Sequence, residues 1–156
     1  MLMIAAVAET GRTVLAVLEP GDTVLEALGE ACLRFGIENA AIPVFLGAFT
    51  ELEFIGAEEP PLDEDAPMQS ASLVRNCEGI GSGTVTRGPE GPQVHLHASV
   101  GAKGDSARAT AGHVLRGTVQ YPTEVMITEI LSPALSRQPN DRARGLATLV
   151  FDCTAG

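Results

Sequence analysis

One segment of the chain has clear helical periodicity, and this limits how the rest can fold. From Thr23 to Phe35 the apolar residues fall on a single helical face: Val24, Leu25, Leu28, Ala31, Cys32 and Phe35. Asp22 is a suitable N-cap before this segment, and Gly36 is a suitable stop after it. We therefore expect one principal helix, at residues 23–35.

The other apolar runs are short and separated by turn residues, which is typical of strands. We expect strands at 13–18, 40–46, 49–55, 70–75, 94–98, 108–119, 124–131 and 146–151, with a break at Gly47-Ala48. Strands that follow one another directly pair antiparallel. The sequence therefore predicts the α+β class, with a mainly antiparallel sheet of about seven or eight strands and one principal helix.

Three segments between these elements are expected to be irregular. Residues 57–67 are acidic and rich in proline, which favours a solvated loop. Residues 79–83 read GIGSG, and we expect a flexible stretch there. A phosphate cradle is disfavoured because the lysine of a P-loop and the following helix are missing. Residues 132–145 form a loop that carries Arg137, Arg142 and Arg144.

Length and composition narrow the class of protein. A chain of 156 residues fits one domain, residues 1–156, and its net charge of −10 opposes binding to nucleic acid by bulk electrostatics. Cys32, Cys77 and Cys153 are odd in number and far apart, which indicates free thiols in a reducing compartment. The apolar start lacks the basic region of a signal peptide, and no apolar run approaches the ~20 residues that cross a bilayer. We expect a cytoplasmic protein without membrane contact.

All three histidines of the chain lie within residues 94–117. Residues 94–98 alternate strictly, so a strand would send His95 and His97 to one face and Val94, Leu96 and Ala98 to the other. Residues 101–105 indicate a turn, after which the chain returns as a second strand. If Gly101 pairs with Ala107, His95 lies directly opposite His113, with His97 as its diagonal neighbour.

Three imidazoles on one sheet face are a plausible ligand set for zinc, copper, nickel or iron. Three histidines leave a fourth position for water, a substrate or a group from another subunit. The alternative is a polar sheet face or a hydrogen-bonded cluster between subunits.

The segments PQVHLHASV, AGHVLRGTV and EVMITEI resemble the plants-and-prokaryotes conserved (PPC) domain family. The earlier segments LEPGDTVLEALGEACLRFGIENAAI and LGAFTEL are similar to the strand–helix–strand that opens this domain. The resemblance covers residues 14–131. It implies an antiparallel α+β fold, a homotrimer, and a divalent metal, zinc, held by His95, His97 and His113.

The chain departs from the family pattern in two ways. Ala111-Gly112-His113 stands where Gly-Gly-His is common, a change that leaves the site intact. The Arg-Gly-Arg-Pro hooks that accompany this domain in plant DNA-binding proteins are missing. The family's association with DNA therefore rests on a segment that this sequence lacks.

Three functions remain open, in this order. The first is a stand-alone PPC-domain module that binds zinc as a homotrimer and acts in assembly or regulation. The second is a metal-dependent hydrolase, whose bound water would have a pKa near 7 and whose base would be Glu124 or Glu129, which face opposite sides of one strand. The third is a DNA-binding protein that uses Arg137, Arg142 and Arg144. The sequence identifies no catalytic residue and no substrate.

Overall fold

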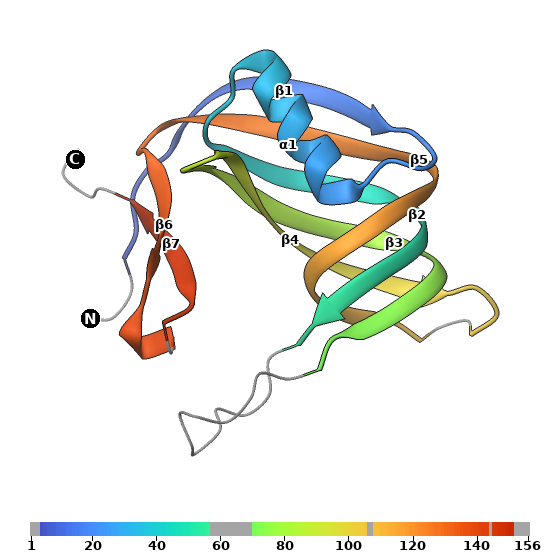
Figure 1. Cartoon of the computed structure of the whole chain (residues 1–156). Helices are drawn as coiled ribbons and strands as arrows, with labels where there is room; N and C mark the ends of the chain where they lie inside the picture. The colour runs from blue at the N-terminus through green and yellow to red at the C-terminus, as the bar shows by residue number, and fades with distance from the viewer. Residues whose placement is uncertain (1–3, 57–69, 106–107, 144, 152–156) are drawn as a thin grey trace.

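Alternating apolar residues build long strands, and an α-helix lies over one end of them (Figure 1). The structure is a computed structural model, and it describes residues 4–56, 70–105, 108–143 and 145–151. The elements follow in the order β1 (Glu9–Leu18), α1 (Val24–Phe35), β2 (Ala40–Ile55), β3 (Ser72–Gly88), β4 (Gly91–Ala102), β5 (Thr110–Ser132), β6 (Leu135–Pro139), a 3₁₀ turn (Asp141–Ala143) and β7 (Ala147–Phe151). All the paired strands are antiparallel. The predicted α+β class is confirmed.

The main sheet closes on itself because β5 pairs with three neighbours. The strand order is β1-β5-β2-β3-β4, and β4 also pairs with the first residues of β5. The later part of β5 pairs with β1 instead. The sheet therefore forms a small barrel whose β4–β5 edge is a short seam, and α1 lies across one end of it (Figure 1).

The barrel interior is filled mainly by aliphatic side chains. α1 contributes Val24, Leu28 and Cys32, and a stacked pair of rings, Phe45 and Phe49, lies opposite on β2. Cys32 and Cys77 are free and buried, and burial raises the pKa of the Cys32 thiol to about 11. These two cysteines therefore act as small core residues, and Cys153 lies outside the described residues.

The sequence predicts the C-terminal end of α1 correctly but misplaces its N-cap. Gly36 adopts a left-handed conformation, with φ of 65°, and closes the helix as predicted. The predicted N-cap is wrong by one residue, because Thr23 occupies that position. The carboxylate of Asp22 instead accepts a hydrogen bond from the backbone N–H of Glu19, at 2.8 Å, and so stabilises the preceding turn.

Several strands run through positions where the sequence predicts interruptions. β2 continues across Gly47, where an added Cβ would lie 2.1 Å from the hydroxyl oxygen of Thr123 on β5. The strands expected at 108–119 and 124–131 are one strand, β5. The expected loop at 132–145 contains β6, which pairs with β7. The acidic segment at 57–67 lies outside the described residues.

The glycines at 79–83 allow two strands of the barrel to approach closely. They lie inside β3, so the expected flexible stretch is wrong. A Cβ on Gly81 would lie 2.5 Å from the carbonyl oxygen of His97, and one on Gly83 would lie 2.2 Å from that of His95. Because real Cβ contacts are longer, only glycine allows β3 to approach β4 this closely.

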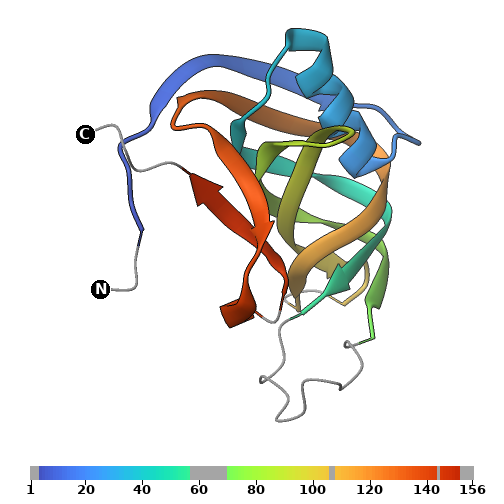
Figure 2. The ribbon, with the colours of Figure 1, turned by 60° about the vertical axis from the view of Figure 1, so that its left-hand side comes forward.

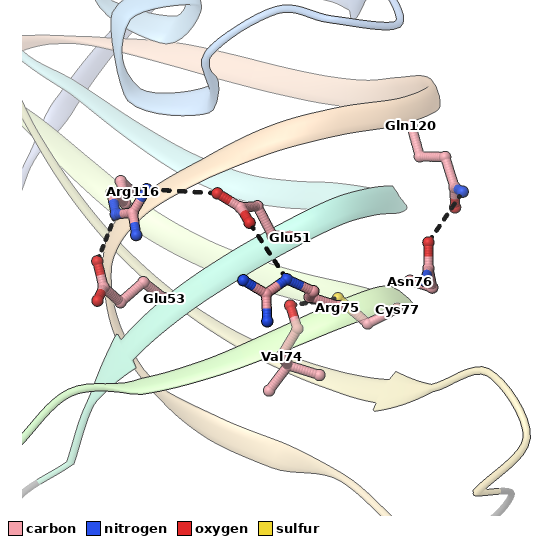
Figure 3. A network of polar contacts seen from close by, with 8 residues as sticks. All are labelled: Glu51, Glu53, Val74, Arg75, Asn76, Cys77, Arg116 and Gln120. Atoms are coloured by element: carbon pink, nitrogen blue, oxygen red, sulfur yellow. Dashed lines mark hydrogen bonds and ion pairs between the residues drawn. The ribbon is translucent and has the colours of Figure 1, made fainter.

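The outer face of the barrel carries two further features. The β6–β7 hairpin stands beside the barrel, and β6 packs against β3 (Figure 2). Elsewhere on this face Arg116 of β5 pairs with both Glu51 and Glu53 of β2, and Arg75 of β3 also pairs with Glu51 (Figure 3). We call these four residues the ionic network. No helix among the described residues has the length and apolar character needed to span a bilayer.

Candidate metal centre

The barrel seam brings the three histidines together on its outer face. Strand alternation buries Leu96 and Ala98 in the core and turns His95 and His97 outward on β4. His113 comes from the adjoining residues of β5. The ring centroids lie 4.6 Å apart for His95–His113, 5.0 Å for His95–His97 and 5.3 Å for His97–His113.

The predicted face is correct, but the predicted register is wrong. His97, not His95, lies directly opposite His113, and Val100 pairs with Thr110. The observed register is therefore shifted by two residues from the one that a Gly101–Ala107 pairing would set. Because side chains alternate with a period of two, a shift of two residues keeps all three imidazoles on one face.

The ligand atoms of the cluster are close enough to converge on one ion. One ring nitrogen from each histidine lies within 4.8 Å of the other two. A tetrahedral ion bound at about 2.0–2.1 Å would need these nitrogens about 3.4 Å apart, so the rings would draw together on binding. His113 Nδ1 is buried and has no hydrogen-bond partner among the described residues, which fits a nitrogen reserved for a ligand.

The surroundings of His95 and His113 favour the neutral form of these two imidazoles. Burial lowers the pKa of His95 to about 4, with smaller effects from Arg137, His113 and His97. Burial also lowers the pKa of His113, followed by the charges of His97 and Arg137. A neutral imidazole offers a nitrogen lone pair, so these residues fit a divalent metal at neutral pH.

Arg137 is a neighbour of the cluster that the sequence did not place there. It extends from β6, and its Nη2 donates to the hydroxyl of Thr84 at 3.0 Å. Thr84 is the cross-strand partner of His95, so both side chains lie on the outer face. No local motif links residues 95 and 137; only the packing of β6 on β3 brings them together.

A hollow of about 460 Å³ adjoins the exposed side of the cluster. The residues that line it include Ile80, Ser82, His97, Ser99 and Ala111. A larger hollow, of about 560 Å³, lies between α1 and the β3–β4 turn and contains no histidine. The smaller hollow is relevant to the candidate metal centre, because His97 lines it.

The candidate bases lie apart from the histidines. The cluster of metal-ligating residues contains neither Glu124 nor Glu129 within the described part of the chain. The Glu129 carboxylate accepts hydrogen bonds from Arg12 near the far end of β5, and this contact lowers its pKa. Of the loop arginines, Arg142 is exposed and Arg144 lies outside the described residues.

Together, a closed antiparallel barrel, one covering helix and a His-x-His strand paired with a third histidine define a class of small α+β domains. The chain belongs to the Plants and Prokaryotes Conserved (PCC) domain family, whose model matches residues 5–131. This is the PPC family that the sequence resembles, and the resemblance is confirmed.

Solved structures share this fold at low identity. A protein of Archaeoglobus fulgidus described as metal-containing is 21% identical over 95% of this chain and 99% of its own, with a TM-score of 0.78. A PPC protein of Pyrococcus horikoshii is 24% identical over 94% and 97%, with a TM-score of 0.76. A protein of Ralstonia eutropha JMP134, provisionally named as DNA-binding, is 22% identical over 88% and 90%, with a TM-score of 0.72. No curated protein matches the chain.

Proposed function

We propose that this protein is a metal-binding module in which His95, His97 and His113 hold one zinc ion. The observation that carries the proposal is the convergence of three outward imidazoles, one of them with a buried nitrogen that has no partner in the described part of the chain. The metal-containing description of the Archaeoglobus protein supports it by analogy of fold. When bound, zinc would supply a Lewis acid with a free fourth position.

Metal content tests this assignment directly. We expect about one zinc per chain in protein purified without an affinity tag, as three ligands suit one ion. The triple variant His95→Ala/His97→Ala/His113→Ala should contain none. Its control is Arg116→Ala, which alters the same outer face but no ligand. A parent protein that takes up no metal even with added zinc would contradict the proposal.

The module is proposed to act as a homotrimer through the outer face of the sheet. The strand registers place the exposed Glu124 of β5 in one row with three apolar side chains, between Val17 of β1 on one side and Leu46 of β2 and Ile80 of β3 on the other. Val17, Leu46, Ile80 and the nearby Leu15 are 57%, 39%, 66% and 76% exposed. Exposed apolar side chains grouped in this way favour burial by a partner, and a second copy offers the same surface.

The oligomeric state tests the interface. Sedimentation should give three chains for the parent and fewer for Ile80→Glu, which adds a second carboxylate to the row. Leu33→Glu is the control, because Leu33 is 65% exposed on α1, away from the row. A monomeric parent would overturn the trimer without affecting the metal assignment.

A metal-dependent hydrolase is the second candidate. The hollow of about 460 Å³ beside His97 favours it, because a substrate could approach the fourth position there. The expected bases Glu124 and Glu129 lie elsewhere, so this reading needs a base from another subunit or from the substrate. Ester hydrolysis by the zinc-loaded parent, absent from the triple variant, would support it.

DNA binding is the third candidate. The name of the Ralstonia protein supports it, while the net charge of −10 opposes it. Of the arginines that were expected to contact DNA, Arg137 hydrogen-bonds Thr84 and leaves only Arg142 exposed among the described residues. Binding that weakens steeply with salt and is lost in Arg142→Gln would be required to accept it.

A further inference from the structure

Arg137 differs from the exposed, ion-paired arginines because it is half-buried and takes part in no ion pair among the described residues. The ion pairs of the described residues involve Arg12, Arg75, Arg87, Arg108 and Arg116, but not Arg137. Its side chain is half-buried against β3, and its Nε–H is fully buried with no hydrogen-bond acceptor within the residues that the structure describes. A buried donor without an acceptor destabilises the protein unless a ligand or solvent satisfies it.

The place of this guanidinium is fixed by two contacts. Nη2 donates to Thr84 Oγ1 at 3.0 Å, and Nη1 points to the backbone carbonyl of Ala147 on β7, at 3.5 Å. Thr84 pairs across the strands with His95, so the positive charge is held beside the histidine cluster. A charge in this position opposes an incoming metal cation, which makes its presence unexplained if the site holds a metal alone.

The repulsion between Arg137 and the metal is offset if the site binds a negatively charged ligand together with the metal. A guanidinium presents donors in a planar fork that matches the oxygens of a carboxylate or a phosphate. The Nε–H without an acceptor belongs to that fork, so an oxyanion would satisfy it.

We propose that Arg137 makes the three-histidine site selective for small oxyanions, so that its ligand or substrate carries a carboxylate or a phosphate group. The proposal rests on the proposed metal site and names the class of molecule that this site accepts. Arg137 is then a binding residue contributed by the β6–β7 hairpin, and not part of a DNA-contacting loop.

The test uses the cobalt-loaded full-length protein, because Co²⁺ has a visible spectrum sensitive to nearby ligands. Acetate and inorganic phosphate are titrated separately as probes, with neutral acetamide as the control for shape. We expect acetate or phosphate to change the spectrum with a defined affinity and acetamide to leave it unchanged. The two probes distinguish a carboxylate ligand from a phosphate ligand.

Arg137→Gln should affect the anion and the metal in opposite directions. Loss of charged hydrogen bonds should weaken the anion about tenfold or more. Loss of the repelling charge should tighten Co²⁺ in anion-free buffer, by about fivefold. Arg137→Lys keeps a charge but not the fork, so it should restore the Co²⁺ affinity of the parent and only part of the anion affinity. Arg142→Gln, an exposed arginine near the hairpin, should match the parent in both.

The outcomes separate the two proposals. The anion site alone would be overturned if the parent binds cobalt normally but neither anion changes its spectrum. It would also be overturned if the anions change the spectra of the parent and of Arg137→Gln equally. Weaker binding of both cobalt and anion in Arg137→Gln would assign Arg137 a purely structural role and also overturn it. Failure of the parent to bind cobalt at all would overturn the metal assignment and the anion site together.

Discussion

Two polar regions of the outer barrel face share the strand β5 but differ in how their charges are satisfied. In the ionic network, Arg116 contacts two carboxylates and Glu51 contacts two arginines (Figure 3). Three residues earlier on the strand, His113 has a buried nitrogen without a hydrogen-bond partner among the described residues, and none of the ion pairs found there includes the nearby Arg137. Groups that are mutually satisfied stabilise a surface, whereas groups left without partners indicate that a ligand completes them.

The strongest test of this difference is to substitute residues in each region and measure the affinity for zinc. His113→Ala removes a ligand and should lower zinc affinity by more than about a hundredfold, since even indirect partners of ligands contribute 10–100-fold. Isothermal titration with zinc measures the change. Equal zinc affinity in His113→Ala and the parent would remove the functional distinction between the two regions.

A backbone change beneath the cluster should have the next largest effect. Gly83→Ala places a Cβ against the carbonyl oxygen of His95 and forces β3 away from β4. We expect it to lower the free energy of unfolding by about 1–3 kcal/mol. Urea denaturation of the metal-free protein measures this, and Gly56→Ala is the control because an added Cβ there meets no neighbour. Unchanged stability would show that the strands adjust without cost.

The histidine cluster should also make the metal-free protein sensitive to mild acid. His95 has a pKa of about 4 when folded, against an ordinary value of 6.5, so protonation favours the unfolded chain. Stability should be complete above pH 6.5 and fall as the pH drops from 6.5 towards about 4. His113, whose pKa is also lowered, acts in the same direction. Glu129 adds to the loss only below its ordinary value of 4.5.

Urea denaturation across this pH range, in the presence of a chelator, measures the effect. His95→Gln removes the titrating group and should flatten the profile between pH 6.5 and 4.5. A parent protein whose stability stays constant over that interval would contradict the burial that lowers the pKa of His95.

The smallest effect is expected in the ionic network. Arg116→Ala removes contacts between side chains that are 59%, 28% and 25% exposed, so solvent screens them. We expect a loss of about 0.2–1 kcal/mol in the free energy of unfolding and no change in zinc affinity. Thermal unfolding and zinc titration test both parts. A large loss of zinc affinity in Arg116→Ala would show that the ionic network contributes to metal binding, and the two regions would then not differ in function.

The sequence predicted the parts of this molecule that depend on local pattern. Helix periodicity located α1, and strand alternation placed His95 and His97 on one face. The register was wrong because it depends on the length of the β4–β5 connection, which turn residues indicate only loosely. The glycines of β3 suggested flexibility because their contacts with β4 are made by residues distant in the sequence. Arg137 was assigned to a loop for the same reason: its neighbours Thr84 and His95 lie on other strands.

The position of the histidines on the barrel seam has one more consequence. The β4–β5 edge consists of four residue pairs, and His97–His113 is the last of them. An ion held by β4 and β5 together would cross-link the seam reversibly, because it can bind and dissociate. Backbone amides along this edge should then exchange with deuterium more slowly in the loaded protein, so that the barrel itself reports whether the site is filled.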